Sequence, residues 1–230
     1  MLDPEVLGPG KQAGYPGGFS YYVVGRGGVL GDVDASVVVS AFGFFAEGLV
    51  RSLWESGVVV EGARAAADRY TEGAASWGRR RLVGFAGAGR LAELVERVVD
   101  GTDATGLVLF AGWRAQTRPT DDLGRCYVLL HVLRELRGAA HVACVAAAGL
   151  GPLEAILLNP NGRGAEQAKL FGWGPDLPDV GGLAPAFERA ETDTNLVVAR
   201  ALAVLSDDEL DELANLVDAA AVAVARPVND

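Results

Sequence analysis

A single histidine stands in a segment that is otherwise small and apolar. The stretch AAHVACVAAAG surrounds His141 with Ala, Val, Cys and Gly, which is typical of a buried helical segment. A buried imidazole either has a hydrogen-bond partner for each ring nitrogen or serves a binding or catalytic site. Because its neighbours are small and leave room for a second molecule, we expect His141 to face a cavity.

The residues around His141 favour one long helix with a polar side. Apolar spacing and a capping aspartate predict a helix from Asp121 or Asp122 to about Ala148, ended by Gly149. At about 100° per residue, its polar side collects His131, Arg134, Glu135, Arg137, Gly138 and His141. Two interpretations stay open for His131, Arg134 and Glu135, which form either a solvated face or the wall of a site.

A carboxylate on the following helix would complete an acid-base set. Glu154 stands in the first turn after Pro152, where its plainer role is to complement the helix dipole. If that helix folds back, Arg137, His141 and Glu154 bring a cation, a base and a carboxylate to one cavity. We therefore expect these three to be the catalytic residues of a metal-independent acid-base enzyme, if the protein is catalytic. The expected ligand-binding residues are Arg134, Gly138, His131 and Trp173, the last closing the cavity.

Metal and cofactor sites have little support in the sequence. The chain has two histidines, and one helix would hold them about 15 Å apart, too far to share a metal ion. No C-x-x-C or H-x-x-x-H spacing is present. We expect no metal and no cofactor. The alternative is a haem with His141 as its axial ligand and Arg134 or Arg137 near the propionates.

Composition sets the expected partners and location. The chain of 230 residues carries 20 basic and 30 acidic residues, so its net charge is -10 and phosphate backbones would on average be repelled. We expect no nucleic-acid partner. The first residues lack a secretory signal and no apolar run reaches about 18 residues, which indicates a cytoplasmic protein without a membrane partner. A helix would hold Cys126 and Cys144 about 27 Å apart, so both are expected as thiols.

The sequence predicts an all-α, multi-helix bundle with a Gly-rich N-terminal arm. Residues 1–31 are dense in Gly and aromatics and are expected as an arm or loop, and residues 32–230 as a single helical domain with a sub-boundary near 174–184. Strand signals at 58–60 and 107–110 are short and isolated. The expected helices are 35–55, 61–81, 89–99, 121–148, one starting at 152, 165–171, 185–205 and 207–225.

The last predicted helix offers two further interpretations. Ser206 and Glu209 form a capping box, S-x-x-E, ahead of an apolar run. An apolar stripe then runs along one face and consists of Leu210, Leu213, Val217 and Ala221. That stripe suits either a homodimer contact or an ordinary core.

The long helix and its surroundings resemble a known family. The run LLHVLRELRGAAHVACVAAAGLGPLEAIL, followed by KLFGWGPD, resembles the signature region of the SalK-like proteins of actinobacteria, a helix-turn-helix family. The stretches GRGGVLGDVDASVVVSAFGFFAE and AGWRAQTRPTDD are similar to its earlier regions. The resemblance is most specific at Arg134, Arg137, Gly138, His141, Glu154, Gly172 and Trp173, and it implies a place in secondary metabolism. The winged-helix-like stretch that the family implies after GW is replaced here by PDLPDVGGLAPAFERAETDTN.

Two functions follow as hypotheses. The leading one is a small-molecule-binding helical protein that takes a small organic metabolite into a cavity lined by Arg137, His141 and Glu154. The alternative is a ligand-responsive transcriptional regulator of the helix-turn-helix class that uses the same cavity. Its candidate DNA-reading segment is the arginine cluster at 79–81.

The substitution His141→Ala separates a site residue from a core residue. For a functional base beside a cavity, we predict an intact fold and a loss of ligand binding or turnover of about 10²-fold. A histidine that serves only the core would instead cost about 1–3 kcal/mol of unfolding free energy with full ligand affinity retained. Thermal melting and ligand titration of the variant distinguish the two.

Overall fold

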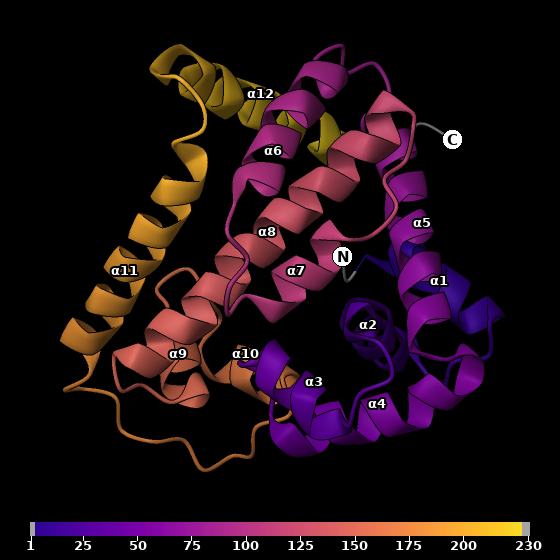
Figure 1. Ribbon diagram of the computed structural model, residues 1–230. Helices are drawn as coiled ribbons and strands as arrows, with labels where there is room; N and C mark the ends of the chain where they lie inside the picture. Colours follow the sequence, from indigo (N-terminus) through magenta and orange to yellow (C-terminus); the bar gives the residue numbers. More distant parts are fainter. Residues whose placement is uncertain (1–2, 227–230) are drawn as a thin grey trace.

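The protein is built from α-helices, which confirms the all-α prediction (Figure 1). The computed structural model describes residues 3–226, and no strand occurs in this range. The helices are α1 Pro4–Gln12, α2 Gly18–Gly27, α3 Ala35–Phe42, α4 Glu47–Glu61, α5 Ala63–Arg81, α6 Ala88–Gly101, α7 Val108–Arg114, α8 Asp122–Ala147, α9 Pro152–Leu158, α10 Ala165–Leu170, α11 Ala184–Leu202 and α12 Asp207–Ala225, with a 3-10 turn at Gly28–Leu30.

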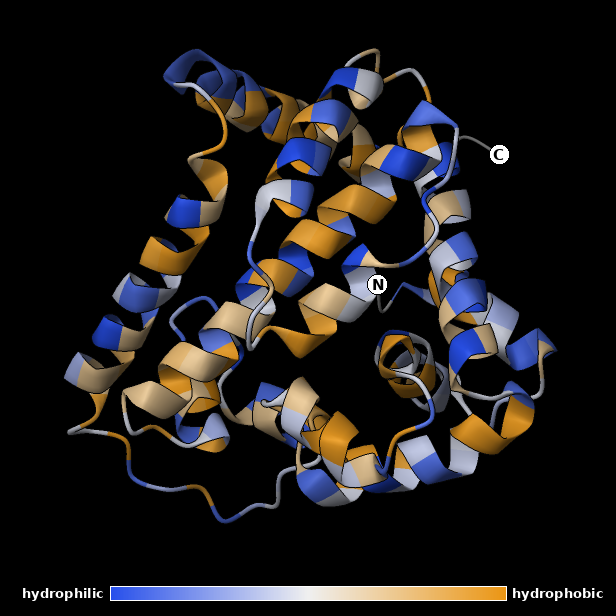
Figure 2. Ribbon diagram, in the orientation of Figure 1, coloured by the Kyte–Doolittle hydropathy of each residue, from blue (hydrophilic) through white to orange (hydrophobic). Residues whose placement is uncertain are grey.

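Helix α8 runs through the middle of the molecule. It packs against α5, α6, α7 and α11, and apolar residues follow its length (Figure 2). Its start is fixed by Asp121, whose carboxylate accepts a hydrogen bond from the backbone N–H of Gly124. It ends before Gly149, whose φ of 79° lies in the left-handed region that favours glycine. The predicted bounds of this helix are confirmed, and its thiols Cys126 and Cys144 are free.

The glycine-rich N-terminal segment is helical, so the expectation of an arm or loop is wrong. Helices α1 and α2 occupy it, and most of α2 is buried against α5 and α4. Its glycines allow close helix packing, because a Cβ at Gly25 would lie 2.7 Å from the side chain of Tyr70. The high density of glycine in this segment reflects close contact between helices. Composition alone does not distinguish such a contact from a loop.

The helix expected over residues 35–55 is divided in two. Gly43, with a φ of 64°, ends α3 after Phe42 and brings the chain against Val142 of α8. Helix α4 begins at Glu47 and continues through Gly57 instead of stopping there. The short apolar runs at 58–60 and 107–110 belong to α4 and to the start of α7, so neither forms a strand.

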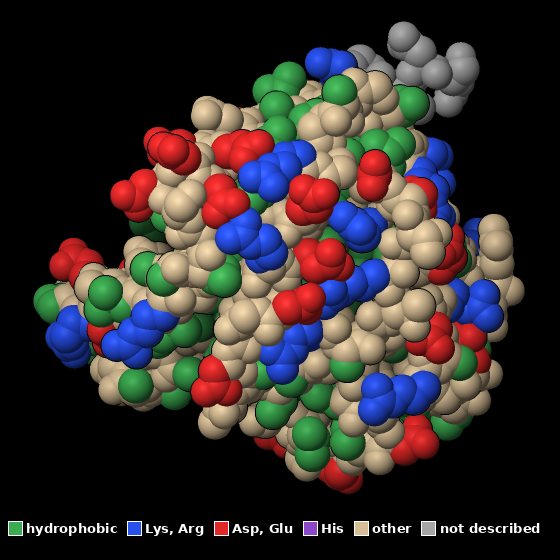
Figure 3. Space-filling model, turned by 45° about the horizontal axis from the view of Figure 1, so that its top comes forward, with side chains coloured by type: hydrophobic (Ala, Val, Ile, Leu, Met, Phe, Trp, Pro, Cys, Tyr) green, Lys and Arg blue, Asp and Glu red, His purple; other side chains and the backbone are tan. Residues whose placement is uncertain are grey.

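The last two helices reach the body of the protein through a segment without helix, residues 171–183. Helix α11 packs against α8, and α12 lies across α6 (Figure 1). Basic and acidic side chains alternate over the face where α6 and α12 meet (Figure 3). The domain boundary near 174–184 stays a prediction.

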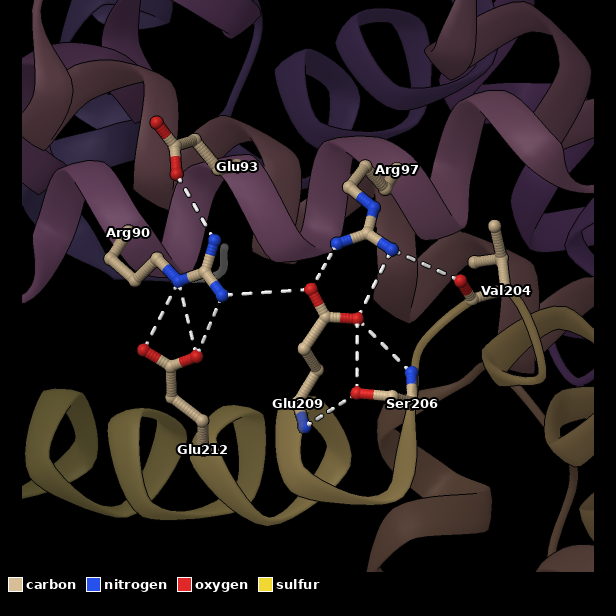
Figure 4. Close-up of polar contacts among 7 residues, drawn as sticks. All are labelled: Arg90, Glu93, Arg97, Val204, Ser206, Glu209 and Glu212. Carbon is tan, nitrogen blue, oxygen red and sulfur yellow. Dashed lines mark hydrogen bonds and ion pairs between the residues drawn. The ribbon is translucent and has the colours of Figure 1, made fainter.

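Ion pairs hold α12 against α6 (Figure 4). Arg97 pairs with Glu209, and Arg90 pairs with Glu212 at 2.8 Å. The predicted capping box is present, since Glu209 accepts a hydrogen bond from Ser206 N–H at 3.0 Å and donates its own N–H to the Ser206 hydroxyl. The side chain of Glu209 therefore both caps α12 and ties it to α6.

The α6–α12 contact should weaken in acid. The hydrogen bond from Arg97 lowers the pKa of Glu209 to about 2, so its stabilising effect is present above the ordinary carboxyl pKa of about 4.3 and is lost as the pH falls toward 2. We predict that Glu209→Gln, which keeps the capping box, lowers the melting temperature at pH 7 and that this difference disappears near pH 2.

Thermal melting between pH 2 and pH 7 checks this. Asp211→Asn removes a carboxylate from the same helix that forms no ion pair within residues 3–226, and it should leave the pH profile close to that of the original protein. A Glu209→Gln deficit of constant size across this range would contradict the prediction.

Candidate functional site

A cavity of about 1230 Å³ lies along α8, large enough for a drug-sized organic molecule. Helix α8 supplies the polar wall, while α3, the turn after it and α12 supply aromatic and aliphatic side chains. The lining residues include His131, Arg134, Arg137, Gly138 and His141 from α8, Phe42, Phe44 and Phe45 around the α3–α4 turn, Val198 and Leu202 from α11, and Leu210, Leu213 and Val217 from α12.

A buried ion pair joins α2 to α8 beside this cavity. Arg26 donates two hydrogen bonds to the carboxylate of Glu135, from Nε at 3.0 Å and from Nη2 at 2.8 Å. Glu135 is fully buried and Arg26 is 8% exposed. Arg134 adds a third hydrogen bond to the same carboxylate at 2.8 Å, from a side chain that is 57% exposed. Two guanidinium groups therefore share one carboxylate.

Both members of the buried pair are held in their charged forms. Burial alone would raise the pKa of Glu135 and lower the pKa of Arg26. The opposite charge outweighs burial in each case, so the pKa of Glu135 lies below its usual range and the pKa of Arg26 above its own. The Arg26 guanidinium also lies 4.4 Å from the ring centroid of Phe42, a cation–π contact inside the cavity wall.

His131 lies beside this pair without a hydrogen bond. It is 4% exposed, and its ring meets the ring of Trp113 edge-on at 4.3 Å. Within residues 3–226 neither ring nitrogen has a hydrogen-bond partner, and Nε2 is 3.6 Å from the nearest Glu135 oxygen. Burial lowers the pKa of His131 to about 3, so the ring is neutral and carries one donor and one acceptor.

His141 has a defined tautomer. The hydroxyl of Thr194 donates its hydrogen to the carbonyl of Ala190 at 2.6 Å, so at 3.0 Å it accepts from Nδ1–H of His141. Nε2 is then the basic nitrogen, and it lies 3.5 Å from a carboxylate oxygen of Glu191. Burial lowers the pKa of His141, which keeps the ring neutral at pH 7.

The structure brings five of the predicted site residues together and places two elsewhere. His131, Arg134, Arg137, Gly138 and His141 all line the cavity. Glu154 and Trp173 are not among its lining residues.

The sequence assigns Glu154 as the carboxylate of the acid-base set, but a different residue takes that position. The carboxylate of Glu154 accepts the N–H of Gly151 at 2.7 Å and caps α9. The carboxylate beside Arg137 and His141 is Glu191 of α11, which accepts a hydrogen bond from Arg137 Nη2 at 2.9 Å. The turn after α10 is fixed by Trp173, which donates from Nε1 to the carbonyl of Phe44 at 2.9 Å.

Sequence reasoning missed two things: residues on helices other than α8, and the burial of some α8 side chains. The interpretation of a solvated face is wrong for Glu135 and His131, which are buried. Arg26 gave one usable signal, a lone charge within the apolar run SYYVVGRGGVL. Thr194 and Glu191 gave none, because they reach His141 from across the fold.

Helices α8 and α9 form a bent pair. The connection Ala148–Gly151 turns the chain by 106° between them, within the range of helix-turn-helix units. A family model described as "Helix-turn-helix family" matches residues 1–178. The chain belongs to the helix-turn-helix family. No curated protein and no solved structure matches it.

Membership of the helix-turn-helix family corrects the expected partner. The prediction of no nucleic-acid partner, made from the net charge, is wrong because this family suggests DNA binding. Net charge averages the whole surface, whereas phosphate contact needs only a local basic face.

The arginine cluster at 79–81 is engaged within the protein. Arg79 pairs with Glu72 and Asp121, and Arg80 pairs with Glu5. Arg81 donates to the carbonyl of Val224 at 2.6 Å. These side chains serve contacts between helices.

The matched region stops short of part of the cavity wall. Helices α11 and α12 begin at Ala184 and Asp207, beyond the last matched residue. They carry five of the lining residues named above, together with the Glu191 and Thr194 partners of His141. The apolar stripe of α12 faces this cavity through Leu210, Leu213 and Val217. Within residues 3–226, no group of three His, Cys, Asp or Glu could hold a metal ion, and no single helix could cross a bilayer.

The Arg26–Glu135 pair yields a double-mutant prediction. Arg26→Met or Glu135→Leu alone leaves an uncompensated buried charge and should cost about 3–5 kcal/mol of unfolding free energy. The double variant should recover most of that loss, because it leaves only Arg134, which reaches solvent. Urea denaturation of the four proteins measures this coupling, and additive losses in the double variant would contradict it.

Proposed function

We propose that this protein is a DNA-binding regulator controlled by a small organic metabolite held in the cavity along α8. One observation carries the proposal: α8 lines the cavity with five polar-side residues and also forms the bent pair with α9. Family membership supports the DNA partner. The resemblance of the signature region to SalK-like proteins supports a metabolite of actinobacterial secondary metabolism.

Helix α8 offers a direct route between ligand and DNA. Its 26 residues extend over about 39 Å, and the lining residues stand up to its last turns before α9. A ligand that contacts this wall differently in two arrangements of α8 and α9 would shift the population between them. Couplings of this kind usually change affinity by about 5–150-fold.

The cations that follow α9 are the proposed DNA contacts. Helix α9 has no basic residue, whereas Arg163 and Lys169 are exposed just after it. Neither forms an ion pair within the described part of the chain, in contrast to the arginines of α5 and α6. Both side chains are therefore free to meet phosphate oxygens.

A second candidate function rests on the fixed tautomer of His141. His141 lines the cavity, and a neutral imidazole with Nε2 as its basic nitrogen is a candidate general base. Glu191 would stabilise the imidazolium that forms after proton transfer, as it lies 3.5 Å from Nε2. Turnover measurements on His141→Ala test this enzyme hypothesis directly.

The DNA-binding proposal predicts a salt-dependent complex. In fluorescence anisotropy, duplex fragments from the region around its own gene should bind at about 50 mM salt and weaken steeply toward 200 mM. Arg163→Ala/Lys169→Ala should weaken binding by about 10-fold or more through the loss of two phosphate contacts.

A matched double variant controls for charge. Lys11→Ala/Arg200→Ala removes two exposed cations from α1 and α11 and should retain most of the affinity. Equal losses in both double variants would rule out Arg163 and Lys169 as contacts, and absence of any complex at 50 mM salt would overturn the proposal.

A further inference from the structure

The charges around Glu135 in the cavity wall do not cancel. Arg26 and Arg134 both line the cavity, and both donate to the single carboxylate of Glu135. Asp218 lines the α12 wall and pairs with neither of them. The cluster therefore holds two positive charges against one negative charge.

The next pair along the helix is balanced. Arg137 meets Glu191 at 2.9 Å, one cation with one carboxylate. The excess positive charge is thus confined to the cluster of Arg26, Arg134 and Glu135. Water screens the charge of Arg26 little, because Arg26 is 8% exposed, whereas the 57% exposed side chain of Arg134 adds a more strongly screened positive charge to the same cluster.

His131 supplies a second and independent indication of a ligand. It lines the cavity beside the same cluster, is more than nine-tenths buried, and has no hydrogen-bond partner on either ring nitrogen within residues 3–226. A buried polar group left unpaired is destabilising, and a ligand that reached it would satisfy it. Both ring nitrogens are closed to solvent in this arrangement, so the ring must turn toward the cavity before its N–H can meet an anionic oxygen.

The remaining walls favour an apolar body. Phe45 and Phe171 stack at 4.1 Å between ring centroids, and both line the cavity. Leu210 and Leu213 contribute aliphatic surface from α12. These walls suit a flat ring system or a hydrocarbon chain.

We propose that the cavity binds an amphipathic carboxylate, with its head group among Arg26, Arg134 and His131 and its apolar body against Phe45 and the α12 leucines. This inference rests on the cavity being the ligand site of the proposed function. It adds the chemical class of the ligand and the residues that meet its head group. A neutral molecule of the same shape would leave the excess charge and His131 unsatisfied.

Two fluorescent probes that differ only in their head groups test the proposal. Pyrenebutanoate carries a carboxylate, and pyrenebutanol is its neutral counterpart. Titration of the full chain should show the carboxylate binding about 10-fold or more tightly than the alcohol, as expected of a charge-assisted hydrogen bond.

Two substitutions locate the head group. Arg134→Gln should abolish the preference for pyrenebutanoate without changing pyrenebutanol binding, whereas Arg189→Gln, the same charge change on exposed α11 surface, should preserve it. His131→Phe should weaken pyrenebutanoate binding severalfold while raising the melting temperature by about 2–4 °C, because it replaces an unpaired buried ring with an apolar one. If His131 had a purely structural role, the substitution would not raise the melting temperature and weaken binding of the carboxylate at the same time.

The possible failures are distinguishable. If neither probe binds, the cavity is not a ligand site and the proposed function fails with it. If both bind equally, or if Arg134→Gln keeps the preference, the cavity stands and the carboxylate assignment is overturned. An unchanged affinity in His131→Phe would remove His131 from the head-group site.

Discussion

The buried hydrogen-bonded pair of Arg26 and Glu135 is the constraint on which the rest of the site depends. It joins α2 to α8 through two residues that are 109 positions apart in the sequence. Both groups are charged although they are buried away from water. Trp113 supports it by donating its indole N–H to the Arg26 carbonyl at 3.2 Å. Because two hydrogen bonds to one carboxylate fix the guanidinium plane, the same contact also sets the cation–π contact with Phe42.

The sequence predicted what depends on local spacing. Helix α8, its bounds and the shared side of Arg134, Arg137 and His141 followed from one regular period on one helix. The capping box at Ser206 was equally local. These features need no knowledge of what packs against them.

The errors came where tertiary packing decides. The glycines of α2 favour a loop in the sequence, but in the structure glycine lets Tyr70 approach the helix closely. The linear sequence does not contain that contact. The sequence points to Glu154 because it stands on the helix that follows His141, whereas 53 positions separate His141 from the hydroxyl that orients it. Net charge misjudged the partner because it is a sum over all faces.

The position of the family match has a consequence for how this chain diversifies. Its matched part, residues 1–178, holds α8, α9 and the ion pair, while α11 and α12 follow as a separate stretch after residues 171–183. The buried ion pair and the part of the cavity wall formed by α11 and α12 are thus encoded in different stretches of sequence. Under the proposed function, substitutions in α11 and α12 can therefore change which molecules the cavity accepts, while the part of the chain that matches the family model stays unchanged.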